Sequence, residues 1–327
     1  VKHIKSSQKR FFFLMLLFIG SMAGFVLAAN AILFFIFYEL MSICSFLLIS
    51  FEHHNKEAVK AANKCFLLTQ IGGILVFIAL VVLSLESSSL NILTMINYNY
   101  SINVLKIALS FLVLGALSKS SIFPFNWLPD AMHAPSPVSA LLHSATMVNA
   151  GIYVIARFLP LFGNFKSLAY LAIGFSFISL LYSSFAALLE NDVKRILAYS
   201  TIVNLSYIFS TFLLLYPLSE SSASFHLLNH AIFKSGLFLV MGSIIAKVGQ
   251  KELTKLEGRA QILGKYKYFL LILIFSACAL PFTNSFLSEW SIYNSWINYF
   301  PLGAVSYTHL RAHETSLHLV CRLLLEK

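Results

Sequence analysis

The chain has 327 residues, of which 58% are hydrophobic and only 11% are charged. Soluble globular proteins have about 45–50% apolar and about 25% charged residues, so this chain has too few charges to cover a water-soluble surface. The composition excludes cytosolic enzymes, secreted disulfide scaffolds and nucleic-acid-binding proteins, although the formal net charge is +10. We predict an all-α, polytopic membrane protein.

Apolar stretches long enough to cross a bilayer recur along the sequence, since about twenty apolar residues span a hydrocarbon core roughly 30 Å thick. We expect about nine to ten transmembrane helices, the last window being long and broken. The windows are 11–28, 30–50, 65–85, 104–123, 138–158, 167–189, 196–216, 225–247 and 268–300.

Lysine and arginine in the short loops predict the orientation, because such residues accumulate on the cytoplasmic side. Segments 86–103 and 217–224 contain neither residue type, and we place them outside. The basic residues within 2–10, 56–64, 194–195 and 247–267 then fall inside, and only Arg157, Lys166 and Lys106 fall near the outside face. We expect a multi-pass protein of the cell inner (plasma) membrane with a cytoplasmic N-terminal segment.

The C-terminal residues 305–327, VSYTHLRAHETSLHLVCRLLLEK, are abruptly more polar than the rest. They resemble a translated sequencing-library adapter, and we exclude them from fold reasoning. We expect one truncated transmembrane domain at 1–304, and the absence of an initial Met indicates a fragment. The alternative is a natural amphipathic tail, whose histidines we do not assign as a metal site: His309, His313 and His318.

No pattern typical of soluble catalysis is present. The four cysteines, Cys44, Cys65, Cys278 and Cys321, lack the spacing of a metal site. There is no phosphate-binding glycine loop and no nucleophile elbow. Gly72 and Gly73 lie within an apolar window and indicate close helix packing. We expect no cofactor, no metal and no catalytic site in this chain.

Ionisable residues inside the apolar windows are the strongest functional signal. Such a group costs at least about 2.5–3.5 kcal/mol at membrane depth and is functional by default. The alternative is a structural role, as interhelical ion pairs and hydrogen-bonding histidines. The candidates for proton translocation are Glu39, Lys119, His143, His226, His230, Lys234 and Glu289.

Spacing arranges three of these candidates on one helix face. His226, His230 and Lys234 stand at i, i+4 and i+8, and therefore stack over about 12 Å of helix. Histidine both accepts and donates protons near neutral pH, so this face is a candidate proton wire. Glu39 is the natural counter-charge for a buried Lys119.

Two prolines predict broken helices beside the charges. Pro124 follows Lys119 by five residues, and Pro281 with the polar stretch 283–285 precedes Glu289. Proline ends or kinks a helix, and discontinuous helices at membrane depth often mark ion sites. The alternative is an ordinary loop, which we prefer for the stretch from Pro129 to Pro137.

Four stretches together resemble a known superfamily of antiporter-like membrane subunits. It includes Mrp-type cation/proton antiporters, respiratory complex I and membrane-bound hydrogenases. The similarity extends over about residues 11–300. The stretches are FYELMS (37–42), KSSIFPFNWLPDAMHAPSPVSALLHSATMVNAGIYVIARF (119–158), NDVKRILAYSTIVNLSYI (191–208) and FHLLNHAIFKSGLFLVMGSI (225–244).

The resemblance implies a fold of about fourteen helices with two inverted repeats, each with a broken helix. It implies that Glu39 is the acid of a charge pair and that Lys119 is its partner in the broken helix. His143 would be the next relay group. His226 and His230 would form the central relay with Lys234 as central lysine, and Glu289 would occupy the terminal broken helix.

Within the superfamily, APSPVSALLHSATMVNAGIY is most similar to the large A subunit of Mrp antiporters. Glu289 departs from the lysine expected there and is more similar to hydrogenase and complex I relatives, and Asn126 replaces the usual histidine.

The main hypothesis is a proton-conducting subunit of a multisubunit Na+/proton antiporter, with other membrane subunits, protons, Na+ and the lipid bilayer as partners. One alternative is a proton-pumping subunit of a NADH:quinone oxidoreductase or hydrogenase, a translocase without a cofactor of its own. A structural membrane scaffold is the third possibility.

Overall fold

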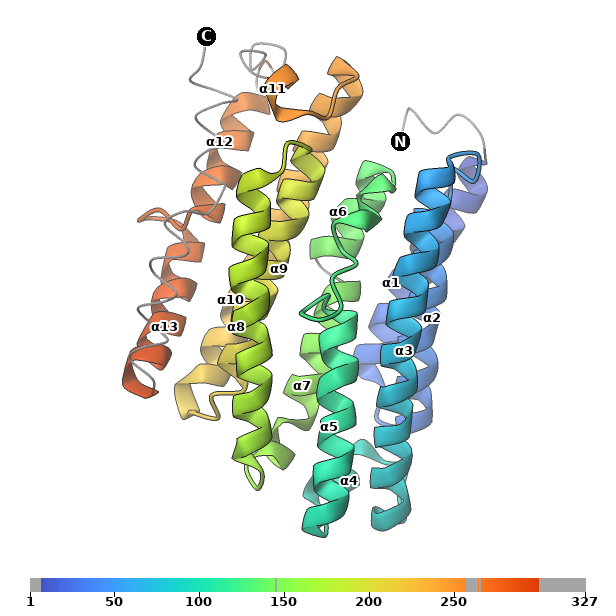
Figure 1. Cartoon of the computed structure of the whole chain (residues 1–327), viewed down its shortest axis with the longest axis vertical. Helices are drawn as coiled ribbons and strands as arrows, with labels where there is room; N and C mark the ends of the chain where they lie inside the picture. The colour runs from blue at the N-terminus through green and yellow to red at the C-terminus, as the bar shows by residue number, and fades with distance from the viewer. Residues whose placement is uncertain (1–6, 145, 257–263, 265, 300–327) are drawn as a thin grey trace. The chain divides into compact units, whose positions relative to one another are not determined.

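The computed structural model describes residues 7–144, 146–256, 264 and 266–299, and these are organised almost wholly as helices (Figure 1). The adapter-like segment 305–327 and its histidines lie outside the described residues. The chain divides into two compact units. Of the described residues, the first unit comprises 7–134 and 146–176, and the second comprises 135–144, 177–256, 264 and 266–299.

The first unit is built on pairwise packing of α1 on α2, α2 on α3, α3 on α5, and α5 on α7. Asparagine side chains cap the N-termini of α2, α3 and α4 by accepting from backbone N–H groups. The helices are α1 (Gln8–Leu27), α2 (Ala31–Ile49), α3 (Lys56–Ser87), α4 (Ile92–Asn97), α5 (Ile102–Lys119), the 3-10 turn η1 (Asp130–His133), α7 (Met147–Phe162) and the first part of α8 (Lys166–Leu189).

The second unit is centred on the long helix α10, which packs against α6, α9, α12 and α13 (Figure 1). Asp192 caps α9 and forms an ion pair with Lys251 at 3.3 Å, which ties the start of α9 to the segment after α10. The helices are α6 (Ser136–Ser144), the second part of α8, α9 (Val193–Phe212), α10 (Pro217–Val248), α11 (Leu253–Leu256), α12 (Tyr266–Ala277) and α13 (Asn284–Tyr299).

The all-helical, polytopic membrane architecture is confirmed. Over the described residues, seven helical stretches are long and apolar enough to cross a membrane. The window 196–216 is helix α9, which is not among them. Its residues are buried on almost every side, so α9 needs no apolar surface for lipid. The last window, 268–300, consists of the two shorter helices α12 and α13.

The helices α5 and α12 end in the same way. In α5, Ile122 N–H donates to Leu117 O at 3.0 Å and Ser121 N–H to Ser118 O at 3.2 Å. In α12 the equivalent bonds join Leu280 to Phe275 and Ala279 to Ser276, both at 3.1 Å. This is the Schellman motif, which places one residue in the left-handed region.

The left-handed residues of these two motifs are Ser121, with φ 56°, and Ala279, with φ 47°. Pro124 and Pro281 therefore follow helices that have already ended at Lys119 and Ala277. Proline is common just beyond such an ending because it cannot continue the helix.

Replacing Ala279 by Gly should stabilise the protein, because glycine adopts positive φ without the steric cost of a Cβ. We expect a gain of about 0.5–1 kcal/mol, measured as a higher melting temperature of the purified full-length protein in its assembled complex.

The equivalent change Ser121→Gly should have the opposite effect. Ser121 Oγ accepts from the backbone N–H groups of Trp127 and Leu128 at 3.1 and 3.0 Å, and both residues are fully buried. Trp127 N–H also donates to the Phe125 carbonyl oxygen at 3.0 Å, but Leu128 N–H loses its partner, and a buried donor left unpaired costs about 1–3 kcal/mol. Equal shifts in melting temperature for the two variants would contradict this account of the two helix ends.

Candidate functional site

Lys119 is the last residue of α5 and is completely buried in the first unit. Its ammonium group donates to the backbone carbonyl oxygen of Tyr38 at 3.0 Å and to the hydroxyl of Ser42, both on α2. It also lies 4.0 Å from the centre of the Tyr38 ring, a cation–π geometry. The C-terminus of α5 adds the negative end of its helix dipole. Neutral groups therefore solvate this buried charge.

Glu39 follows Tyr38 on α2, and its carboxylate acts electrostatically on Lys119. The two side chains do not touch: across the described residues, no carboxylate oxygen lies within 4.0 Å of Lys119 Nζ. The carboxyl group instead faces Gln70 on α3. The structure thus brings the predicted pair together as separated charges, with Lys119 bonded to the backbone and hydroxyl of α2.

A second polar cluster lies in the second unit, where α10 faces α9. Lys234 donates to the hydroxyl of Ser200. His226 Nε2 lies 3.2 Å from Asn204 Oδ1. Asn204 in turn donates from Nδ2 to the carbonyl oxygen of Ser200 at 2.8 Å. Two of the three residues predicted to share one face of α10 are therefore linked through one turn of α9.

The contacts of His226 restrict where its protons can lie. Because Asn204 Nδ2 donates to a carbonyl, Asn204 Oδ1 faces the ring, and His226 Nε2 is the donor. His226 Nδ1 lies 2.9 Å from Ser288 Oγ, and this hydroxyl also reaches Ser285 O at 3.0 Å. If the hydroxyl proton points to Nδ1, the ring is neutral. If it points to Ser285 O, Nδ1 must carry a proton, so rotation of one hydroxyl accommodates both charge states.

His230 and His143 are two buried groups with open hydrogen-bonding capacity. Both rings are fully buried, and neither ring nitrogen of either residue has a hydrogen-bond partner within the part of the chain that the structure describes. His230 contacts Phe233 edge-on, and His143 on α6 stacks on Phe238 of α10 at 5.3 Å. Unpaired buried polar atoms are costly, so both rings are sites where a proton or water can be received.

Glu289 lies on α13 directly after Ser288 and is 8% exposed. Hydroxyl groups surround this part of the helix. Ser285 bonds Ser276 of α12 at 2.8 Å, and Ser295 bonds Ser222 of α10 at 3.3 Å. Glu289 is therefore on the same helix as Ser288, the hydroxyl partner of His226, and lies more than one turn after the start of α13.

The small polar partners of the charged groups were not predicted from the sequence. A hydroxyl or amide contacts each of Lys119, Lys234 and His226, and these partners are Ser42, Ser200, Asn204 and Ser288. The sequence does indicate such partners: serines recur at the three- to four-residue spacing of one helix face within apolar windows. On α13 the serines 285, 288, 291 and 295 repeat every three to four residues.

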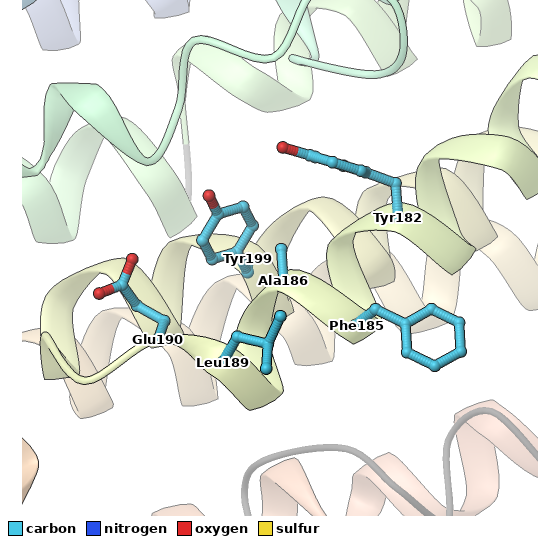
Figure 2. Close-up of a pocket in the computed structure, with 6 residues that line it drawn as sticks. All are labelled: Tyr182, Phe185, Ala186, Leu189, Glu190 and Tyr199. Atoms are coloured by element: carbon cyan, nitrogen blue, oxygen red, sulfur yellow. The ribbon is translucent and has the colours of Figure 1, made fainter.

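A surface hollow of about 470 Å³ lies on α8 and α9 of the second unit (Figure 2). Figure 2 shows the Glu190 carboxylate and the Tyr199 hydroxyl on the same side of these helices. Glu190 is paired with Arg195 at 3.2 Å. None of the seven candidate residues lines the hollow, so it is not the site that the sequence indicates.

A cluster suited to a metal is absent from the described residues: no three His, Cys, Asp or Glu side chains come together there. The candidate residues are instead single ionisable groups, and Lys119, Lys234 and His226 each contact a hydroxyl or an amide.

Residues 28–309 match the family profile described as NADH:quinone oxidoreductase/Mrp antiporter, TM. The chain belongs to this family. It is 38% identical over 307 residues to a Staphylococcus epidermidis protein named as antiporter subunit mnhA2, covering 88% of this chain and 38% of that protein. A Staphylococcus aureus protein of the same name is 38% identical over 303 residues, covering 87% of this chain and 38% of that protein. The chain thus spans about two fifths of these relatives.

Two solved structures of this family share the fold. In the Mrp complex from Dietzia sp. DQ12-45-1b, one chain matches with a TM-score of 0.90 and 27% identity, over 98% of this chain and 36% of that one. In the archaeal membrane-bound sulfane sulfur reductase, the TM-score is 0.91 and the identity 25%, over 99% of this chain and 68% of that one. The antiporter-like fold implied by the sequence motifs is confirmed.

Replacing Asn204 by Leu should destabilise the protein, because it removes the acceptor of the buried His226 Nε2. We expect a loss of about 1–3 kcal/mol, measured as a lower melting temperature of the full-length complex.

Thr201→Val is the matched control on the same helix, since among the described residues the Thr201 hydroxyl bonds only the Leu197 carbonyl one turn earlier. A melting temperature that falls equally in the two variants would contradict a specific role of Asn204 in holding His226.

Proposed function

We propose that this chain is a proton-conducting part of a multisubunit Na+/proton antiporter, in which protons move between ionisable groups at membrane depth. The observation that carries the proposal is the pair of buried lysines. Lys119 is 0% and Lys234 is 2% exposed, and each donates to a serine hydroxyl of the neighbouring helix. A neutral partner supports either protonation state of an amine, as a proton carrier requires.

The proton route runs, in this proposal, through Glu39, Lys119, His143, His226, His230, Lys234 and Glu289. Glu39 is separated from Lys119 and modulates the charge of its ammonium group without fixing it. His226 accepts and releases a proton against Ser288, and His230 and His143 receive protons on their unpaired nitrogens.

We also propose the membrane, the partner subunits and the coupling cation of this chain. We place it in the inner (plasma) membrane with its N-terminal basic segment in the cytoplasm, as the lysine and arginine distribution indicates. We propose other membrane subunits as its partners, because both structurally similar chains belong to named complexes. Na+ is the proposed coupling cation, because the sequence motifs resemble those of Mrp-type cation/proton antiporters and the relatives are named antiporter subunits.

A redox-driven pump is the second candidate function. The glutamate at 289 and the long match to a chain of the sulfane sulfur reductase favour it. In that role the chain moves protons while other subunits bind the redox cofactors. Purification of the native complex decides between the two: co-purifying iron–sulfur subunits support the redox pump, and small hydrophobic subunits support the antiporter.

Substituting Lys119 or Lys234 by Ala in the full-length, assembled complex should abolish Na+-driven proton movement, with a loss of about a hundredfold or more. The measurement is the change in internal pH of membrane vesicles after Na+ addition. Lys106→Ala on α5 and Lys247→Ala on α10 are matched controls, because both side chains are exposed on the same helices. Intact transport in both Lys119→Ala and Lys234→Ala would overturn the proposed function.

Glu39→Gln should lower the transport rate by a similar factor, because an amide keeps the shape of the side chain and removes its negative charge. Ion flux that is insensitive to Glu39→Gln would favour the third possibility, a membrane scaffold with static charges. The protein level in the membrane is measured for each variant, so that loss of transport is separated from loss of assembly.

A further inference from the structure

Two adjacent glycines of α3 face different helices. A methyl group at position 72 would lie 2.6 Å from the side chain of Ser118 and 3.1 Å from the carbonyl oxygen of Gly115, both on α5. A methyl group at position 73 would instead collide with the carboxylate oxygen Oε1 of Glu39 on α2 and come within 2.8 Å of its Cδ. Gly72 therefore permits helix packing, whereas Gly73 leaves room for one charged group.

The Glu39 carboxyl group occupies this space in an unusual way. Its Oε1 atom is buried and has no hydrogen-bond partner in the described residues. Gln70, one turn earlier on α3, faces the same carboxyl group. Since an unpaired buried carboxylate oxygen is costly, its position against a bare stretch of helix backbone requires an explanation other than stability.

We infer that Gly73 is a positioning residue for Glu39: the missing side chain forms a seat, lined by Gly73 and Gln70, that holds the carboxyl group against α3 and apart from Lys119. This inference rests on the proposed function, in which Glu39 acts on Lys119. It adds that the distance between the two charges is set by α3, a helix that carries neither of them.

The groups that act on the Glu39 carboxyl among the described residues are few. Lys119 on α5 and Tyr38 on α2 interact with it electrostatically, and the Gln70 side chain interacts with it from α3. The other helices that pack on α2, which are α1 and α7, contribute no ionisable group recorded as acting on this carboxyl. A displaced carboxyl therefore changes its interaction mainly with Lys119.

Gly73→Ala tests the seat without breaking the fold, because the atom in conflict is the far end of a flexible side chain. In the full-length complex we expect wild-type abundance, transport lowered roughly ten- to hundredfold, and a pH profile of transport displaced by about one pH unit. Gly20→Ala controls for helix propensity, since a methyl group there meets nothing within 4 Å. Gly72→Ala controls for packing on α3.

Double substitution separates steric displacement from a general defect. Glu39→Asp shortens the acid by one methylene and withdraws it from the seat, so Gly73→Ala should have no further effect in that background. Any effect of Gly72→Ala, which acts on the packing of α3 against α5, should be the same in the Glu39→Asp background as in the wild type. Equal effects of Gly73→Ala on wild-type and Glu39→Asp backgrounds would overturn the inference.

Infrared difference spectra taken across the pH profile give a readout that does not depend on turnover. The carboxyl band that is lost in Glu39→Gln identifies Glu39. We expect this band to move in Gly73→Ala and to stay in place in Gly20→Ala and Gly72→Ala. If Glu39→Gln stops transport but Gly73→Ala leaves both band and pH profile unchanged, the inference fails and the proposed function stands. If Glu39→Gln transports normally, the proposed function itself fails.

Discussion

The cost of holding an ammonium group away from water is the constraint on which the rest of this structure depends. Lipid offers no hydrogen bonds, so each buried lysine must be solvated by protein. Lys119 meets this requirement with a backbone carbonyl, a hydroxyl and an aromatic face on α2, at the negative end of its own helix. Lys234 uses a hydroxyl on α9. In both units, a neutral neighbour on the adjacent helix determines where the charge can lie.

The ends of two helices also lie where buried polar side chains must be solvated by protein. A lysine benefits from a helix dipole only within the last turn, and α5 ends at Lys119 itself. The ending is a Schellman motif, held further by Ser121 through its bonds to the loop that follows. The gap between α12 and α13 has the same motif and lies beside Ser288, the partner of His226. Discontinuity and charge occur together because free backbone groups at a helix end solvate polar side chains.

Much of the architecture could be predicted from the sequence because its causes are local. Apolar windows of about twenty residues identify most spans, and the spacing of His226 and Lys234 places them on one face of α10. Helix α9 is less apolar than most of the other spans because protein buries it on almost every side. The window 268–300 consists of the two helices α12 and α13, because hydropathy averages over the break between them. Gly73 shows the same limit: the sequence indicates close packing, but only the structure shows which helix each glycine faces.

The sequence by itself determined that the chain is a helical membrane protein of the antiporter-like family and which ionisable residues fall within its apolar windows. These conclusions depend on composition, on periodicity and on motifs within single segments. Only the tertiary structure decided the partners of those residues: Ser42 and Tyr38 for Lys119, Asn204 and Ser288 for His226, and the seat on α3 for Glu39. The reason is physical, since a hydrogen bond acts over about 3 Å between side chains that can be many residues apart in the chain.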